Sequence, residues 1–256
     1  MPNQPIVTAG LVLRETVTRE TDKILTVLTP DRGKISLIAR GARRKNSRLA
    51  AACQLLAYSE LTIYEKGQWF MLDEAETLEL FTGLRTDFVA LSLASYLADL
   101  TDATAQGEDT SQLLRLLLNA LYALSALKKP PQLVKPAFQF RLMALAGYEP
   151  MADGCALCGA PQPENPMLDV VHGVVHCGKC REKGGLSLPL TASGLAALRY
   201  VLYGDPRRLY SFSLPPEGLR ALNHAADAYV SAQLERSFRT LDYYKTILPQ
   251  EETKYE

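Results

Sequence analysis

The chain has 256 residues, 47% of them hydrophobic and 22% charged, and its formal net charge is zero. This composition is ordinary for a globular protein with a sizeable core, and the length leaves room for two domains. The first ten residues lack a secretory signal, and the most apolar run, residues 113–127, is too short and too polar to span a bilayer. We therefore expect a cytoplasmic protein that does not contact a membrane.

The charges are unevenly distributed along the chain. Residues 1–52 contain 10 basic and 4 acidic residues, whereas residues 53–256 contain 18 basic and 24 acidic ones. A split of this kind indicates that the basic part binds a polyanion.

Alternating apolar and polar residues separated by turn sequences predict five β-strands in the first 80 residues. Five short strands in this length favour a small closed barrel of the OB type. We also expect a short helix at 49–56, between the third and fourth strands. The predicted strands are residues 9–17, 23–29, 34–40, 57–64 and 69–76.

A dense cationic loop follows the third predicted strand. A scaffolded loop of this kind suits the phosphate backbone of a nucleic acid, although a solvated charge run is the alternative. Stacking aromatics would strengthen the first interpretation, but the tyrosines of the fourth strand could equally be ordinary sheet pairs. The predicted DNA-binding residues are Arg14, Lys23, Lys34, Arg40, Arg43, Arg44, Lys45, Arg48, Tyr58 and Tyr64.

After about residue 81 the pattern becomes helical. Apolar periodicity and end signals predict helices near 89–100, 113–127, 133–146, 191–203 and from Pro216 towards Phe238. The predicted fold class is thus α+β, with an OB-fold nucleic-acid-binding domain at 1–80 and an α-helical domain at 81–256. We expect the last eight residues, 249–256, to be frayed.

Two CxxC pairs fall in a gap between the predicted helices, at Cys155, Cys158, Cys177 and Cys180. Two such knuckles 18 residues apart are a strong signal for one structural Zn²⁺ per chain, held by four thiolates. Residues 168–175 read as a β-hairpin between them, which predicts a zinc-ribbon insertion at about 150–188. His176 could replace a cysteine ligand, and a redox role of either pair is the alternative to metal binding.

The sequence contains no phosphate-loop, dinucleotide-binding, serine-hydrolase, zinc-protease or deaminase motif. We therefore expect no enzymatic activity. Besides nucleic-acid binding, a zinc-ribbon scaffold that bridges protein partners remains a candidate function, and a thiol oxidoreductase is a third.

Seven short motifs follow one another along the chain: GLVLR at 10–14, ETDKILTVLT at 20–29, GKI at 33–35, RGARR at 40–44, SRL at 47–49, YEKG at 64–67 and GYEP at 147–150. Together they resemble the RecO family of bacterial recombination mediators and DNA repair proteins. The resemblance departs at Thr18-Arg19-Glu20, where the family commonly has Tyr-Gly-Glu.

The resemblance implies an OB fold, a helical domain and an inserted zinc ribbon. It also implies binding of single- and double-stranded DNA, annealing of complementary strands without catalytic turnover, and a nucleoid-associated location. The implied partners are RecR, the acidic C-terminal tail of single-strand-binding protein and, indirectly, the recombinase RecA, which the protein would help to load. We expect the tail in an apolar pocket of the helical domain, with a basic rim drawn from Lys128, Lys129, Lys135 and Arg141.

Overall fold

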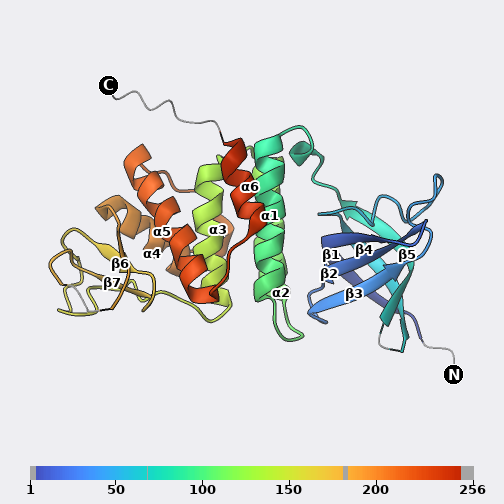
Figure 1. Cartoon of the computed structure of the whole chain (residues 1–256), viewed down its shortest axis with the longest axis horizontal. Helices are drawn as coiled ribbons and strands as arrows, with labels where there is room; N and C mark the ends of the chain where they lie inside the picture. Colours follow the sequence, from blue (N-terminus) through green and yellow to red (C-terminus); the bar gives the residue numbers. More distant parts are fainter. Residues whose placement is uncertain (1–3, 68, 181–183, 249–256) are drawn as a thin grey trace.

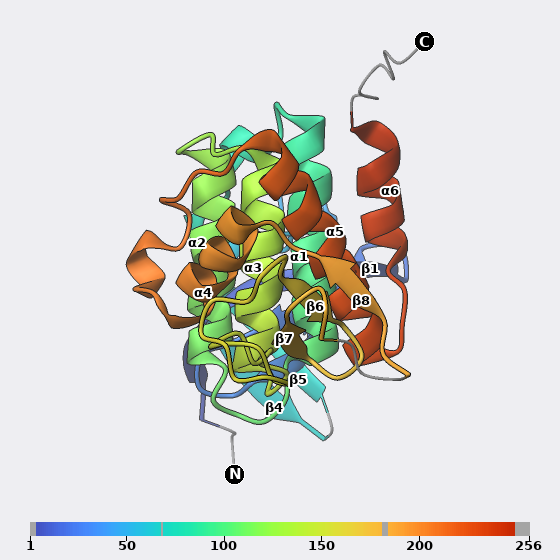
Figure 2. The same ribbon diagram turned by 90° about the vertical axis from the view of Figure 1, so that its left-hand side faces the viewer.

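The structure is a computed structural model that describes residues 4–67, 69–180 and 184–248. A β-barrel formed by the first part of the chain stands at one end of a bundle of helices (Figure 1). A small sheet lies at the other end, in front of the helices in Figure 2. The tail at 249–256, which we expected to be frayed, lies outside the described residues.

The barrel confirms the OB-like prediction. Its strands are β1 (Ile6–Thr18), β2 (Asp22–Leu28), β3 (Lys34–Ala39), β4 (Tyr58–Lys66) and β5 (Trp69–Glu79). They close in the order β1-β2-β3-β5-β4, with β3 and β5 parallel and the other neighbours antiparallel. Side chains alternate between an apolar interior and the outer face, as the sequence pattern predicted.

The predicted helix at 49–56 is wrong, because these residues form consecutive turns. Their backbone bonds are irregular: Cys53 N donates to Leu49 O, but Gln54 N donates to Ala51 O, and Leu56 has a left-handed φ of 63°. Ala52, Cys53 and Leu56 are buried. The segment therefore buries apolar side chains without the repeating bonds that a helix needs.

Six α-helices in the described part of the chain build the second domain: α1 (Phe88–Thr104), α2 (Ser111–Ser125), α3 (Pro131–Leu145), α4 (Ala192–Tyr203), α5 (Pro216–Leu234) and α6 (Arg239–Ile247). The last predicted helix was too long. It ends at Leu234 because Glu235 takes the left-handed conformation, with a φ of 50°. A separate helix, α6, then packs against α1 (Figure 1). No described helix combines the length and apolar character that crossing a bilayer requires.

The insertion between α3 and α4 contains the predicted hairpin. Strands β6 (Met167–Asp169) and β7 (Val174–His176) pair antiparallel, and β8 (Ser187–Pro189) adds a third strand beside β6. Gly173 lies in the turn with a φ of 70°. Three strands of three residues bury little surface, so this module needs further support.

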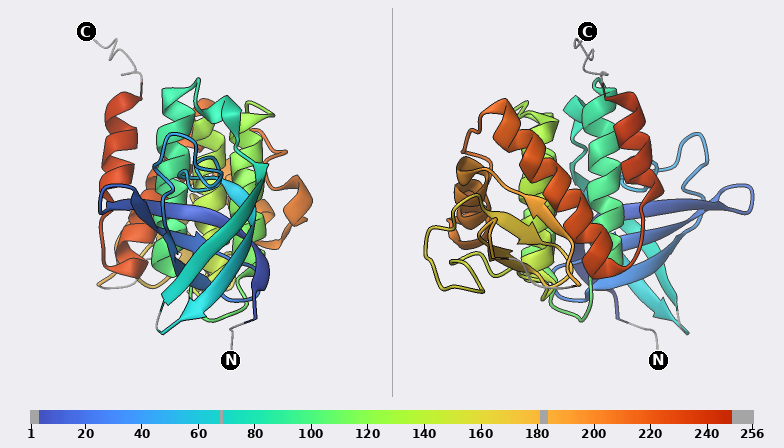
Figure 3. Two further views of the ribbon diagram at one scale, coloured as in Figure 1. Left: turned by 90° about the vertical axis from the view of Figure 1, so that its right-hand side faces the viewer. Right: turned by 60° about the vertical axis from the view of Figure 1, so that its left-hand side comes forward.

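The barrel and the helices share one hydrophobic core. Leu11, Leu13, Leu28 and Leu56 of the barrel belong to the same buried cluster as the side chains of α1 and α2. Polar contacts reinforce this docking at the β2–β3 turn, where Thr110 N donates to Pro30 O and Gly33 N donates to Glu108 O at 2.6 Å. The barrel is therefore held in one orientation on the helices (Figure 3).

A substitution at Gly33 tests this contact between the barrel and the helices. Gly33 has a φ of 60°, and a Cβ there would lie 2.1 Å from Gly107 O. We expect Gly33→Ala to lower the unfolding free energy by more than the ~1–2 kcal/mol of left-handed strain alone, because backbone must also move. Gly67→Ala is the matched control, since Gly67 has a φ of 65° with nothing within 4 Å of its Cβ position. Equal losses in urea unfolding of the two variants would contradict this account.

Candidate nucleic-acid interface and metal centre

The basic loop, residues 40–48, is held firmly against the barrel. Gly41 N donates to the Asp22 carboxylate at 2.8 Å, and Arg43 N and Nη1 donate to Thr21 O and Glu20 O. The Gly41 N–H lowers the pKa of Asp22 despite partial desolvation of that carboxyl. These bonds fix the loop beside the β1–β2 turn, as the sequence predicted for a scaffolded loop.

The cations of the loop are accessible to an anion, although Arg43 also donates one guanidinium N–H to Glu20 O. All five are exposed, and none forms a salt bridge among the described residues: Arg40, Arg43, Arg44, Lys45 and Arg48. Five exposed positive charges on a fixed loop produce a strong local potential for phosphate groups.

Two other predicted cations lie on the outer face but are paired. Arg14 and Lys34 both contact the Asp102 carboxylate of α1, at 2.6 and 2.9 Å, and Lys34 also donates to Asp102 O at 2.5 Å. Arg14 still exposes 62% of its side chain, whereas Asp102 exposes 13%. The pair therefore connects the barrel to the helices while leaving one net positive charge at the junction.

Lys23 does not lie on the outer face. Register pairs it with the buried Ala39, so its side chain points inward. There it forms an ion pair with Glu15 and donates to Cys53 O at 2.9 Å. Alternation along the strand, which the DNA-binding prediction did not apply to Lys23, accounts for this position.

The two predicted stacking tyrosines lie in different surroundings. Tyr58, at the start of β4, packs against the core shared with the helices. Tyr64, six residues further on, is half-buried beside Met71 and Lys66 at the other end of the strand. Of the pair, Tyr64 is the one on the part of the barrel away from the helical core.

An acidic face borders the basic loop. Arg48 and Leu49 line a hollow of about 430 Å³ whose other walls are on β4 and β5. Glu60 and Glu76 face each other there across the strands. These negatively charged carboxylates repel phosphate groups, so the acidic face marks one limit of the cationic surface.

The four predicted cysteines come together. All four Sγ atoms lie within 4.8 Å of one another, a set that could hold one metal ion. Cys158 Sγ is 3.8 Å from Cys177 Sγ, and Cys177 N donates to Cys155 Sγ at 3.3 Å. Burial disfavours the Cys155 thiolate, but N–H groups, chiefly of Cys158 and Cys177, outweigh it and lower the pKa of Cys155 to about 6. The pKa of Cys180, by contrast, is raised to about 12, chiefly by its hydrogen bond to Cys158. The close approach of the four sulfur atoms is what suits four-sulfur coordination.

The histidines of the insertion lie outside this cluster. His176 Nδ1 lies 2.8 Å from Cys177 O, and Nε2 lies 2.8 Å from Ser187 Oγ. Both ring nitrogens are therefore occupied, which leaves four cysteines as the ligand set. His172, at the hairpin turn, pairs with Asp169 at 2.8 Å.

The four residues proposed for a partner's tail do not form one rim. Lys128 donates to Gly83 O at 3.0 Å, and Arg141 donates to the carbonyl of Leu202. Lys129 is exposed. Lys135 is 4% exposed and bonds Asp227 at 2.5 Å.

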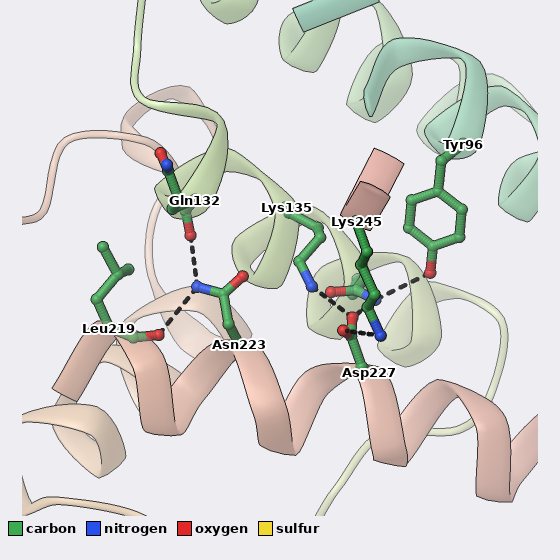
Figure 4. Close-up of polar contacts among 8 residues, drawn as sticks. Tyr96, Gln132, Lys135, Leu219, Asn223, Asp227 and Lys245 are labelled. Carbon is green, nitrogen blue, oxygen red and sulfur yellow. Dashed lines mark hydrogen bonds and ion pairs between the residues drawn. The ribbon is translucent and has the colours of Figure 1, made fainter. Parts of the chain in front are cut away.

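Lys135 instead lines a pocket of about 510 Å³ between α3, α5 and α6. Asp227 is one of its lining residues, and Figure 4 shows Lys135 and Lys245 directed at the Asp227 carboxylate. Gln139 Nε2 also donates to Asp227 Oδ1, at 3.0 Å. Arg220 and His224 add further basic groups, and Leu219 and Leu248 supply apolar walls. Most of these residues lie on α5 and on α6, and the latter helix has no counterpart in the sequence prediction.

Asp227 is a half-buried acid whose charge is balanced by its neighbours. Burial opposes its ionisation, but Lys135 and Lys245, with Gln139, hold its pKa below the usual range. Such a carboxylate stabilises the fold above its unfolded pKa of about 3.9 and loses that effect as the pH falls through its folded value.

We expect Asp227→Asn to cost about 3 kcal/mol of unfolding free energy at pH 7, because it leaves Lys135 buried without its counter-ion. The difference from the wild type should shrink below about pH 4. Asp242→Asn, at an exposed position of α6, should change stability by about 0.5 kcal/mol or less. A pH-independent difference in chemical unfolding would contradict this role.

Two family descriptions together cover nearly the whole chain. "Recombination protein O N terminal" matches residues 4–81, the barrel, and "Recombination protein O C terminal" matches residues 85–242, most of the helical domain with its insertion.

Individual relatives agree over similar lengths. The DNA repair protein RecO of Acetivibrio thermocellus is 31% identical over 241 residues, which are 94% of this chain and 96% of that protein. The DNA repair protein RecO of Heliobacterium modesticaldum is 34% identical over 245 residues, 93% of this chain and 88% of the relative. That of Symbiobacterium thermophilum is 30% identical over 244 residues, 93% of this chain and 96% of the relative. The chain belongs to the RecO family.

Proposed function

We propose that this protein is a non-catalytic mediator of DNA repair and recombination that binds single- and double-stranded DNA through the barrel. The observation that carries the proposal is the basic loop, with five exposed cations fixed against the barrel. The relatives' name, DNA repair protein, supports it. Such a protein would act in the cytoplasm, at the nucleoid.

Annealing of complementary strands follows from the same physics. Guanidinium and ammonium groups that contact phosphates neutralise the repulsion between two strands without reading their bases. Bases that remain accessible can then pair. Lys23, whose side chain points inward, is not part of this proposed surface.

The pocket between α3, α5 and α6 is our candidate site for the acidic C-terminal tail of single-strand-binding protein. Lys135, Lys245 and Arg220 supply positive charge, and Leu219 and Leu248 supply apolar contact. Lys128, Lys129 and Arg141 do not line this pocket. We further propose RecR as a partner and RecA as the recombinase whose loading the protein assists.

For the metal centre we propose Zn²⁺ as a structural ion. Four thiolates suit zinc and leave no open position for a substrate. The three short strands of the insertion bury too little to fold alone, so a metal would supply stability there.

Replacement of Arg43, Arg44 and Lys45 by alanine should weaken binding to any DNA sequence. Each lost phosphate contact should also lower the slope of log K against log salt by about 0.7 for single strands. Fluorescence anisotropy at several salt concentrations measures both. The matched control is Arg207→Ala with Arg208→Ala, two exposed cations on the short 3₁₀ helix Pro206–Arg208. Unchanged affinity and slope in the loop variant would remove the loop from the site.

Metal analysis of the purified protein should find about one zinc per chain. Cys155→Ser with Cys180→Ser should abolish it and lower the melting temperature, since the insertion loses its main support. Cys53→Ala serves as the control because Cys53 is buried in the barrel core, apart from the cluster. Wild-type protein that contains no zinc would contradict the proposal.

The alternative is a zinc-ribbon scaffold whose basic loop docks an acidic protein partner. Titration with a single-stranded oligonucleotide at two salt concentrations separates the alternatives. Salt-dependent binding supports the DNA mediator, and no binding at low salt supports the scaffold.

A further inference from the structure

A row of outward-facing apolar side chains crosses four strands of the barrel. Register places Ile24 of β2 opposite Ile38 of β3, Ile38 opposite Met71 of β5, and Met71 opposite Tyr64 of β4. All four are half-buried. We call this row, together with Trp69, the barrel strip.

The side chains of the barrel strip do not belong to the hydrophobic cores of the described residues. Among the described residues, neither hydrophobic cluster of the protein includes these five side chains. Their neighbours along each strand do point inward: Leu25, Leu37 and Leu72 fill the barrel core. An outer sheet face usually carries polar side chains, so a continuous apolar row there indicates a surface that contacts a ligand.

Trp69 extends the strip with an aromatic ring. It precedes Met71 by two residues on β5, lies opposite Lys66 of β4, and is 46% exposed. With Tyr64 it provides two flat side chains on neighbouring strands. Aromatic faces of this kind stack on nucleobases irrespective of their identity.

Cations border the strip on two sides. On β3, Lys34 precedes Ile38 by four residues on the same outer face, while Arg40 follows it by two and leads into the basic loop. Arg14 of β1 is also outward, opposite Thr26 of β2. Arg14 and Lys34 share the Asp102 carboxylate, so together they leave one net positive charge on their side of the strip. The nearby acid Asp22 is engaged by Gly41 N, although Asp73 of β5 is exposed at the margin. An apolar row between positive edges matches a ligand with apolar faces and a negatively charged backbone.

We propose that the barrel strip contacts the bases of single-stranded nucleic acid while the cations at its edges hold the phosphates. Three inter-strand spacings make the row about 14 Å wide, which accommodates up to about four stacked bases. Duplex DNA hides the faces of its bases, so the strip adds affinity for single strands only. This inference rests on the proposed DNA-binding function and adds the preferred form of the ligand.

The test compares a single-stranded oligonucleotide with a duplex of the same sequence, by anisotropy across a salt series. Ile24→Thr with Ile38→Thr keeps β-branched side chains on the strands but removes apolar surface. We expect the affinity for the single strand to fall about tenfold or more, with the duplex affinity and both salt slopes unchanged. Val7→Thr, an equally conservative change at a 59% exposed position outside the strip, should change neither.

Tyr64 provides a second, independent variant pair. Tyr64→Ala should weaken single-strand binding, whereas Tyr64→Phe, which keeps the ring, should retain it. Thermal melting of each variant verifies that the barrel remains folded.

Three results would overturn the proposal. Strip variants that bind single strands like the wild type, while the basic-loop variant loses affinity, would refute the strip and leave the proposed function standing. Equal losses for single strand and duplex would show that the strip only maintains the barrel. Self-association of the wild type that Ile24→Thr with Ile38→Thr abolishes, with single-strand affinity intact, would make the strip an interface between copies. Absence of DNA binding by the wild type would instead refute the proposed function itself.

Discussion

The arrangement of the molecule depends on the apolar contact between the barrel and helix α1. The side chains of Leu11, Leu13 and Leu28 extend from the barrel into the hydrophobic core of the helical domain. Burial of each leucine contributes about 1.5–3 kcal/mol, more than the surface ion pairs around it. The contact covers one side of the barrel and leaves the outer face of β2, β3 and β5 open. The basic loop and the barrel strip both lie on this open side.

Electrostatics then divides the basic residues of the first part of the chain into two groups. Lys23, Arg14 and Lys34 form ion pairs with Glu15 or Asp102. The cations of the loop remain unpaired among the described residues. The excess positive charge counted in the sequence thus overstates what a ligand meets. Much of the available charge is concentrated in residues 40–48, next to the apolar strip.

Regular strands and the cysteine cluster were predictable from the sequence, whereas irregular backbone and long-range contacts were not. Alternation located all five barrel strands, and the spacing of the cysteines predicted their cluster. The end of α5 was missed because Glu235 takes a left-handed conformation that usually needs glycine or asparagine. Asp102 lies 68 residues from Lys34, so no local pattern could reveal their pairing. The strip depends on the register of four strands, which became visible only when the barrel closed.

The central claim is that the barrel binds nucleic acid through phosphate contacts made by the fixed basic loop. The most direct measurement is the salt dependence of binding between the wild-type protein and a single-stranded oligonucleotide. If the five loop cations each contact one phosphate, log K should fall with log salt with a slope of about −3.5. A slope near zero, or no binding at low salt, would contradict the account.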